Sequence, residues 1–175
     1  MNATKTSKTL LAAAVMAGTL CSATAAFAGT QNSASATGTT NTRIITPISL
    51  TYVSNLNFGD VVSSSSAGTV VVTTAAARSS TGGTTLGNST GVAAAAFTVG
   101  GQGSSTYAIT LPSTSSIASG ANSMTVDAYT SNPSTTGTLS AGGSQGLAVG
   151  ATLNVGASQP TGSYTGTFNV TVAYN

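Results

Sequence analysis

The sequence lacks most of the side chains from which catalytic and metal sites are built. It contains no histidine, no tryptophan, one cysteine and two acidic residues in 175. Nucleophilic catalysis needs a base beside the nucleophile, and metal sites need His, Cys or clustered carboxylates. The abundant Ser and Thr residues have only Asp60 and Asp127 to serve as a base. We therefore expect a protein that is not an enzyme and that binds no metal or cofactor.

The two carboxylates have simpler structural explanations. Asp60 follows Gly59 in a turn sequence, where Asp forms local hydrogen bonds. Asp127 shares parity with Thr125 and Tyr129, which predicts that all three lie on the water-facing side of a strand. A glycosidase needs two carboxylates that converge on one bond, and nothing in the spacing of these two predicts that they meet.

The N-terminus has the pattern of a secretory signal peptide. Two lysines precede an apolar stretch at residues 10–20, and the sequence AFA at 26–28 offers a small-x-small cleavage site. The apolar stretch is shorter than the roughly 20 residues that a membrane-spanning helix needs. We expect residues 1–28 to be removed on export to the periplasm, the cell surface or the medium.

Removal of this leader changes the charge and the cysteine count. Cys21 and both lysines are lost with it, so only Arg43, Arg78, Asp60 and Asp127 remain charged. A chain with so little charge has no basic surface for nucleic acid, and without cysteine it has no disulfide. We expect no nucleic-acid partner, no membrane span in the mature chain, and stability that comes from packing and backbone pairing.

The composition favours an all-β fold. Thr suits a pleated strand, while Gly, Asn and Ser form turns. About eight short strands separated by turn signals predict an antiparallel β-sandwich of immunoglobulin-like or pilin-like type. The expected strands lie at 43–50, 52–58, 68–74, 92–99, 106–111, 123–129, 146–155 and 163–174, with a loop at 79–91.

The expected domain organisation follows from the same pattern. Residues 29–42 contain no large apolar side chain, so they cannot bury enough surface to offset the entropy of ordering. We expect them to form a flexible N-terminal extension. The β-sandwich domain then covers residues 43–175.

The last twelve residues form the clearest strand pattern in the sequence. Thr, Asn and Ala alternate with an apolar series that is interrupted only by Gly166. A strand of this kind at a sheet edge leaves backbone N–H and C=O groups unpaired, and secreted polymers use such edges for strand addition. The apolar series consists of Tyr164, Gly166, Phe168, Val170, Val172 and Tyr174.

The C-terminal pattern resembles the ending of chaperone–usher pilus subunits. The similarity lies in the alternating apolar residues, the penultimate Tyr174 and a glycine fourteenth from the end, Gly162. The resemblance implies an assembly strand whose partners are a periplasmic chaperone and an usher, and self-association through edge strands. Its residues are Gly162, Tyr164, Phe168, Val170, Val172 and Tyr174.

The sequence has two further resemblances. Leu56-Asn57-Phe58-Gly59 resembles a stretch near the start of spore-coat-U-type secreted subunits. The motifs Ile45-x-Pro47-Ile48, Leu56-Asn57-Phe58-Gly59 and Val149-Gly150-Ala151-x-Leu153, together with the C-terminal alternation from Gly162 to Asn175, make residues 43–175 similar to the secreted bacterial domain-of-unknown-function 4402 family, in which no activity is assigned. Typical pilins carry a disulfide, which this mature chain cannot form.

A subunit that polymerises by strand complementation also needs a donor segment. The extension at 29–42 offers only Ala34 and Ala36 as apolar side chains, so it has little to fill a groove. The candidate donor is therefore the segment 42–50, whose apolar knobs are Ile44, Ile48 and Leu50. This choice takes the first strand out of its own domain.

The sequence leaves three functional hypotheses. The first is a secreted structural or adhesive subunit of a bacterial surface appendage or matrix that assembles by strand complementation. The second is a monomeric cell-surface β-sandwich that binds a glycan or a protein through its Ser/Thr/Gly loops. The third is an outer-membrane β-barrel, although the polar side of the last strand suits water better than lipid.

Overall fold

The computed structural model describes residues 33–175 in two units, and the predicted signal peptide lies outside these residues. Residues 33–41, in the first unit, are exposed and contain no regular structure. The second unit, Thr42–Asn175, contains 13 strands and no helix, all in antiparallel sheets. The predicted all-β, antiparallel, sandwich-like class is therefore confirmed. The described residues include no helix that would be suited to crossing a membrane.

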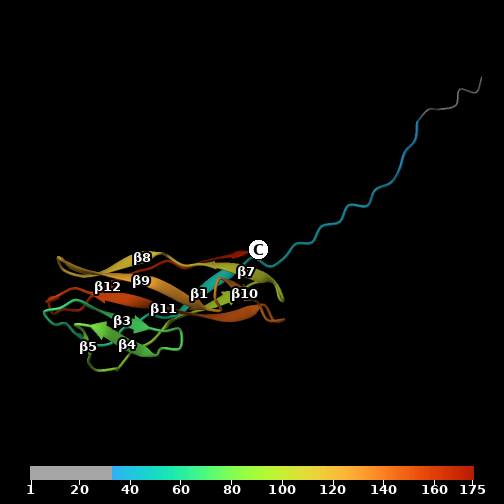
Figure 1. Cartoon of the computed structure of the whole chain (residues 1–175). Helices are drawn as coiled ribbons and strands as arrows, with labels where there is room; N and C mark the ends of the chain where they lie inside the picture. The colour runs from blue at the N-terminus through green and yellow to red at the C-terminus, as the bar shows by residue number, and fades with distance from the viewer. Residues whose placement is uncertain (1–32) are drawn as a thin grey trace, which may run out of the picture. The chain divides into compact units, whose positions relative to one another are not determined.

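The largest sheet is branched around one long strand, β11 (Figure 1). Its main row of strands runs β1 (Ser49–Ser54), β6 (Ala95–Gly100), β11 (Ser144–Val155), β9 (Asn122–Asn132), β8 (Thr114–Ser119) and β12 (Thr165–Gly166). A side branch leaves this row at β11: β3 (Gly68–Val72) pairs with β11, and β4 (Arg78–Gly82) pairs with β3.

β11 holds the two branches together because each half of it has a different neighbour. Its first half pairs with β6, in a register that places Leu147 opposite Phe97. Its second half pairs with β3, where Leu153 lies opposite Val70. β9 pairs with β11 along the other side.

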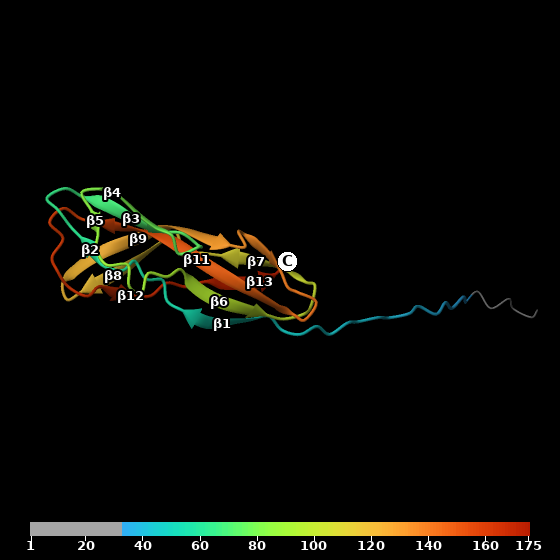
Figure 2. The same ribbon diagram turned by 90° about the horizontal axis from the view of Figure 1, so that it is seen from below.

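Two smaller sheets cover the inner face of this large sheet at opposite ends (Figures 1 and 2). One consists of β10 (Thr136–Thr138), β7 (Thr106–Thr110) and β13 (Thr171–Tyr174), in that order. The other consists of β2 (Val61–Val62) and β5 (Thr85–Leu86). Each cover closes one hydrophobic core.

The core under the three-stranded sheet, here the aromatic core, contains the largest buried side chains. Tyr107 and Leu139 are almost completely buried in it, and Phe97 and Phe168 pack against it. Its buried members are Ala95, Val99, Tyr107, Leu139, Leu147 and Val149.

The core under β2 and β5, here the aliphatic core, is built from smaller side chains. Phe58 and Val61 close it from the cover side. Leu56 and Tyr129 pack against both cores and join them. Its buried members are Val70, Val126, Ala151, Leu153 and Val155.

The predicted loop at 79–91 is wrong in part, because it contains most of β4 and all of β5. β4 has the sequence RSSTG and no apolar alternation, so its pattern does not predict a strand. It forms by pairing with β3 alone. The hydroxyls of Thr69 and Thr81 form a 2.7 Å hydrogen bond across the pair. β2, β8 and β10 were not expected either, and the expected strands at 43–50 and 52–58 are replaced by β1 alone. With the division of the closing strand into two, 13 strands replace about eight.

The prediction that Tyr129 faces water together with Asp127 is also wrong. β9 contains a β-bulge, and Ala128 has a positive φ of 46°. A bulge inserts one residue and shifts the alternation beyond it. Tyr129 therefore turns into the core, where its hydroxyl lies 2.5 Å from that of Ser115.

The expected closing strand at 163–174 is divided into two strands. β12 pairs with β8 of the large sheet, whereas β13 pairs with β7 of the three-stranded sheet. The chain thus crosses from one layer to the other between Gly166 and Thr171. The alternation of exposed and half-buried side chains still continues to Tyr174, as the pattern predicts.

Candidate assembly interface

The first and the last strand of the second unit are both sheet edges. β1 pairs only with β6, and β13 pairs only with β7. The two strands lie close to each other, at the side of the sandwich where the large sheet and the three-stranded sheet end. Two unpaired backbone edges are thereby brought together at one place.

The free edge of β13 carries the backbone groups of Val172 and Tyr174. In an antiparallel pair, hydrogen-bonded and non-bonded residue pairs alternate. The N–H of Asn175 donates to the carbonyl of Thr106, so the residues of β13 that bond to β7 are Thr171 and Ala173. The N–H and C=O groups of Val172 and Tyr174 therefore point away from the sheet.

The free edge of β1 follows from the same alternation. The N–H of Gly101 donates to the carbonyl of Gly143 on the β11 side. Thr98 and Gly100 consequently direct their backbone groups toward β1, where their partners are Thr51 and Ser49. The backbone groups that point away from the sheet on β1 are those of Leu50 and Tyr52.

The predicted assembly residues are distributed over three places. Gly162 and Tyr164 precede β12, and the hydroxyl of Tyr164 donates to the carbonyl of Pro160. Phe168 and Val170 lie in the crossing between β12 and β13, while Val172 and Tyr174 belong to β13. The last four pack against the aromatic core; they are Phe168, Val170, Val172 and Tyr174.

The candidate donor residues are also separated. Ile44 is 93% exposed. Ile48, just before β1, and Leu50, within β1, pack against the aromatic core, and Leu50 lies opposite Val99 of β6. The aromatic core therefore brings Ile48 and Leu50 together with the end of the assembly strand inside one chain.

A row of aromatic rings runs through the gap between the sheets. Tyr52 and Phe97 meet edge to face at 6.3 Å, as do Phe97 and Phe168. Tyr129 continues the row at 5.1 Å from Phe168. Such pairs stabilise beyond the area they bury. Tyr52, at the β1 end, is 58% exposed, so the row reaches the open edge.

Sequence reasoning did not identify the bonds that the Tyr174 hydroxyl makes. This hydroxyl accepts a hydrogen bond from the N–H of Gln102 at 2.6 Å and donates one to the carbonyl of Thr46 at 2.7 Å. It also fills the space beside Gly101 that a Cβ would occupy. The penultimate residue therefore joins the last strand to the segment that leads into β1.

Burial raises the pKa of two tyrosines in the cores. Burial is the cause for Tyr107, whose hydroxyl donates to the side-chain oxygen of Gln145 at 2.8 Å. Burial also raises the pKa of Tyr129, and the charge of Asp127 adds to the effect, while the hydrogen bond with Ser115 opposes it. Both phenols therefore remain protonated at neutral pH.

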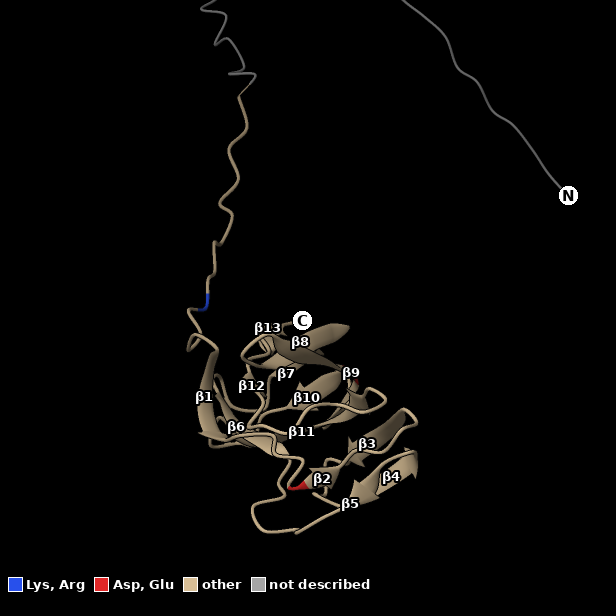
Figure 3. Ribbon diagram, turned by 90° about the vertical axis from the view of Figure 1, so that its left-hand side faces the viewer, with Lys and Arg blue, Asp and Glu red and all other residues tan. Residues whose placement is uncertain are grey.

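Charges are almost absent from the described ribbon (Figure 3). Arg78 uses its guanidinium as a clamp on the cover of the aliphatic core. It donates to the carbonyls of Phe58 at 2.8 Å, Asp60 at 3.1 Å and Gly87 at 2.9 Å. Two grooves lie on the surface of the described residues, and neither Asp60 nor Asp127 lines either of them.

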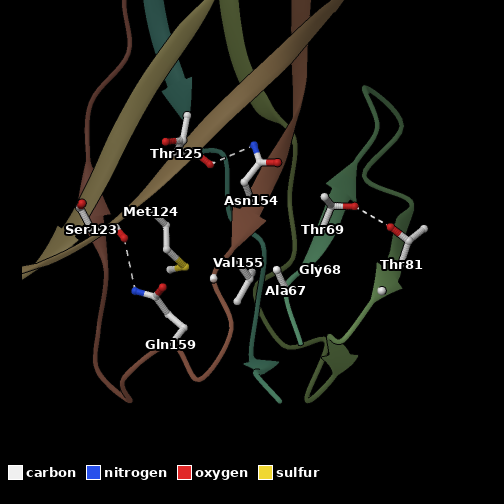
Figure 4. A pocket seen from close by; sticks show the side chains of 12 residues that line it. Ala67, Gly68, Thr69, Thr81, Ser123, Met124, Thr125, Asn154, Val155 and Gln159 are labelled. Carbon is white, nitrogen blue, oxygen red and sulfur yellow. Dashed lines mark hydrogen bonds between the residues drawn. The ribbon is translucent and has the colours of Figure 1, made fainter. Parts of the chain in front are cut away.

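The larger groove, of about 580 Å³, lies where β3, β4, β9 and β11 meet (Figure 4). Thr69 and Thr81 form one wall, and Thr125 and Asn154 form another, with Nδ2 of Asn154 donating to the carbonyl of Thr125 at 3.4 Å. Nε2 of Gln159 donates to the carbonyl of Ser123 at 3.3 Å. The groove therefore presents hydroxyl and amide groups without a charge.

Comparisons with known proteins give one result. A family model described as Domain of unknown function (DUF4402) matches residues 48–174. No curated protein and no solved structure matches the chain.

Proposed function

This chain belongs to the DUF4402 family, and we propose that it is a secreted, non-enzymatic subunit of a bacterial surface appendage or matrix. In this role it assembles by strand complementation. The observation that carries the proposal is the pair of adjacent open edges, β1 and β13. A periplasmic chaperone and an usher are the partners that such an assembly uses before export.

The geometry of the edges supports strand addition. Unpaired backbone groups on a flat edge accept a further strand, and alternate side chains then give specificity. The four residues whose backbone groups point away from the sheets have apolar or aromatic side chains. Three of these side chains pack against the aromatic core, and that of Tyr52 is 58% exposed and contacts Phe97. The four residues are Leu50, Tyr52, Val172 and Tyr174.

The test measures the oligomeric state of the mature chain, residues 29–175, by analytical ultracentrifugation at rising concentration and by electron microscopy. We expect oligomers or filaments. Ala173→Lys places a charge on the exposed side of β13, where edge lysines oppose strand addition. We expect this variant to remain monomeric with an unchanged fold.

Thr110→Lys is the matched control. Thr110 is exposed on the same face of the three-stranded sheet, but it belongs to the central strand β7. The control adds the same charge without reaching the edge, so it should assemble as the wild type does. A wild-type chain that is monomeric at all concentrations would contradict the proposed function.

A second candidate function is that of a monomeric surface protein that binds a glycan. The polar groove of about 580 Å³ favours it, because hydroxyl and amide groups suit an uncharged, hydroxyl-rich ligand. The pairing of β1 within its own chain also agrees with a stable monomer.

This alternative is tested by titrating a panel of neutral oligosaccharides while recording backbone amide signals by NMR. Binding should shift signals near Thr81 and Asn154 in the groove. Thr81→Val should weaken the binding, whereas Thr110→Val, outside the groove, should not change it. Absence of shifts in the groove would leave this function without support.

A further inference from the structure

β1 is attached to the domain by few interactions. It has one neighbouring strand, and its pairing with β6 is interrupted by an irregularity between Tyr52 and Ser54. Val53 is 57% exposed and Tyr52 is 58% exposed. Immediately before β1, Ile44 and Ile45 are exposed although both are large and apolar.

The side chains that β1 and the residue just before it bury leave a slot when they are withdrawn. Ile48 and Leu50 pack against the aromatic core. Without them, the slot is bounded by β6, which offers the backbone of Thr98 and Gly100, and by β13. A strand with the register and the apolar spacing of β1 fills this slot, and a second copy of this chain carries one.

The hydroxyl of Tyr174 is the main specific attachment of the segment that leads into β1. It bonds to the carbonyl of Thr46, which is exposed, and to the N–H of Gln102. Breaking the first bond frees the chain up to Ile48. The next backbone fixed on the other side of β1 is Asn57, which pairs with Ala93.

We propose that β1, with its lead-in segment Arg43–Ile48, is exchanged between copies of this chain, and that the short connection at residues 55–56 is the hinge. This inference rests on the proposed function and names its donor and its acceptor. Exchange remakes the same contacts in a neighbour, so it costs little. It also brings Ile44 and Ile45 to the junction of two domains, where they can be buried.

The test introduces a cysteine pair that bridges β1 and β6. Thr51 and Thr98 are opposite each other in the register, on the face away from the core, at a spacing that a disulfide spans. The mature chain contains no other cysteine. Oxidation of monomeric T51C/T98C should prevent assembly, and reduction should restore it.

Oxidation after assembly gives the second readout. Exchanged strands place the two cysteines of a pair in different copies, so non-reducing electrophoresis should show a ladder of covalent oligomers. T69C/T81C is the matched control, because it bridges β3 and β4 within one hairpin. It should assemble when oxidised, and its disulfide should form within each copy, so that non-reducing electrophoresis shows only single chains.

Two outcomes separate this inference from the proposed function. Normal assembly of oxidised T51C/T98C would overturn the exchange and leave edge-to-edge assembly intact. The same conclusion would follow if assemblies of T51C/T98C that are oxidised afterwards contained no disulfides between copies. A wild-type chain that never assembles would remove both.

A further variant tests the attachment by Tyr174. Tyr174→Phe removes the bonds to Thr46 and Gln102 and keeps the ring. Of these bonds, only the one to Thr46 holds the lead-in segment, and the loss of this one hydrogen bond corresponds to about a fivefold faster exchange. The measurement is the rate at which labelled monomers enter unlabelled assemblies, and an unchanged rate would exclude Tyr174 from the exchange.

Discussion

The aromatic core and the aliphatic core are closed in different ways. The aromatic core is filled by large side chains, and its boundary includes the open edges of β1 and β13. The aliphatic core contains smaller side chains, and its cover is fixed by the hydrogen bonds that Arg78 donates to three carbonyls. Side-chain packing closes the aromatic core, and hydrogen bonds from one side chain fix the cover of the aliphatic core.

The two ends of the domain therefore differ in what closes them: hydrogen bonds fix the cover of the aliphatic core, whereas the aromatic core lies beside edges that are open to a partner. The cover of the aliphatic core is a two-stranded sheet, which is marginal without other support. Arg78 supplies that support with the only cationic side chain near it among the described strands. In the described part of the chain, the aromatic core has no such charged side chain, and it is bounded by two strand edges without partners.

The largest expected effect comes from emptying the aromatic core. Tyr107→Ala removes a fully buried ring and leaves Gln145 without its partner. We expect the free energy of unfolding to fall by about 3–5 kcal/mol. Urea denaturation measures it. Leu153→Ala in the aliphatic core is the comparison, and a larger loss there would reverse the ranking of the two cores.

An intermediate effect is expected at the clamp. Arg78→Met retains an unbranched side chain about as long as the arginine stem and removes the bonds to the carbonyls of Phe58, Asp60 and Gly87. We expect a loss of about 1.5–3 kcal/mol. Hydrogen exchange of the Gly87 amide should accelerate, while that of the Ile109 amide, in the cover of the aromatic core, stays slow.

Arg78→Lys sharpens the same comparison. An ammonium group retains the charge but cannot reproduce the planar fork of a guanidinium. We expect it to recover only part of the lost stability. Equal stability of the lysine variant and the wild type would show that charge, and not the three directed bonds, fixes this cover.

The smallest effect concerns pH. Burial raises the pKa of Tyr107 and Tyr129 in the folded protein. Their protonated forms therefore contribute stability below the unfolded pKa of about 10, and this contribution is lost as the pH rises through the folded values. Tyr107→Phe should reduce the alkaline loss seen in urea titrations. If Y107F/Y129F lost as much stability at alkaline pH as the wild type, the loss would have a cause other than these two phenol groups.

The sequence was informative where one face of a strand is buried. The alternation along the last residues predicted that the side chains of Phe168, Val170 and Val172 turn inward, because burial of one face imposes a period of two. It failed at β4, which has no apolar alternation and forms by pairing with β3. It failed at Tyr129 because nothing in the local sequence marks the bulge.

The assembly interface was only partly visible in the sequence. The apolar knobs of the two terminal segments can be read from their spacing. Their meeting in one core depends on the order of strands in two sheets, which parity does not encode. The bond between Tyr174 and Thr46 joins residues 128 positions apart, so no local pattern predicts it.

The position of β11 determines when this protein can acquire its structure. Its three partners, β3, β6 and β9, all come earlier in the chain, and each can pair with it only after Ser144–Val155 has been synthesised. Folds dominated by such non-local pairs form slowly. Until the C-terminal third of the chain has been synthesised, the apolar residues of these strands therefore lack their partners, and a holdase that shields them would increase the yield of folded protein.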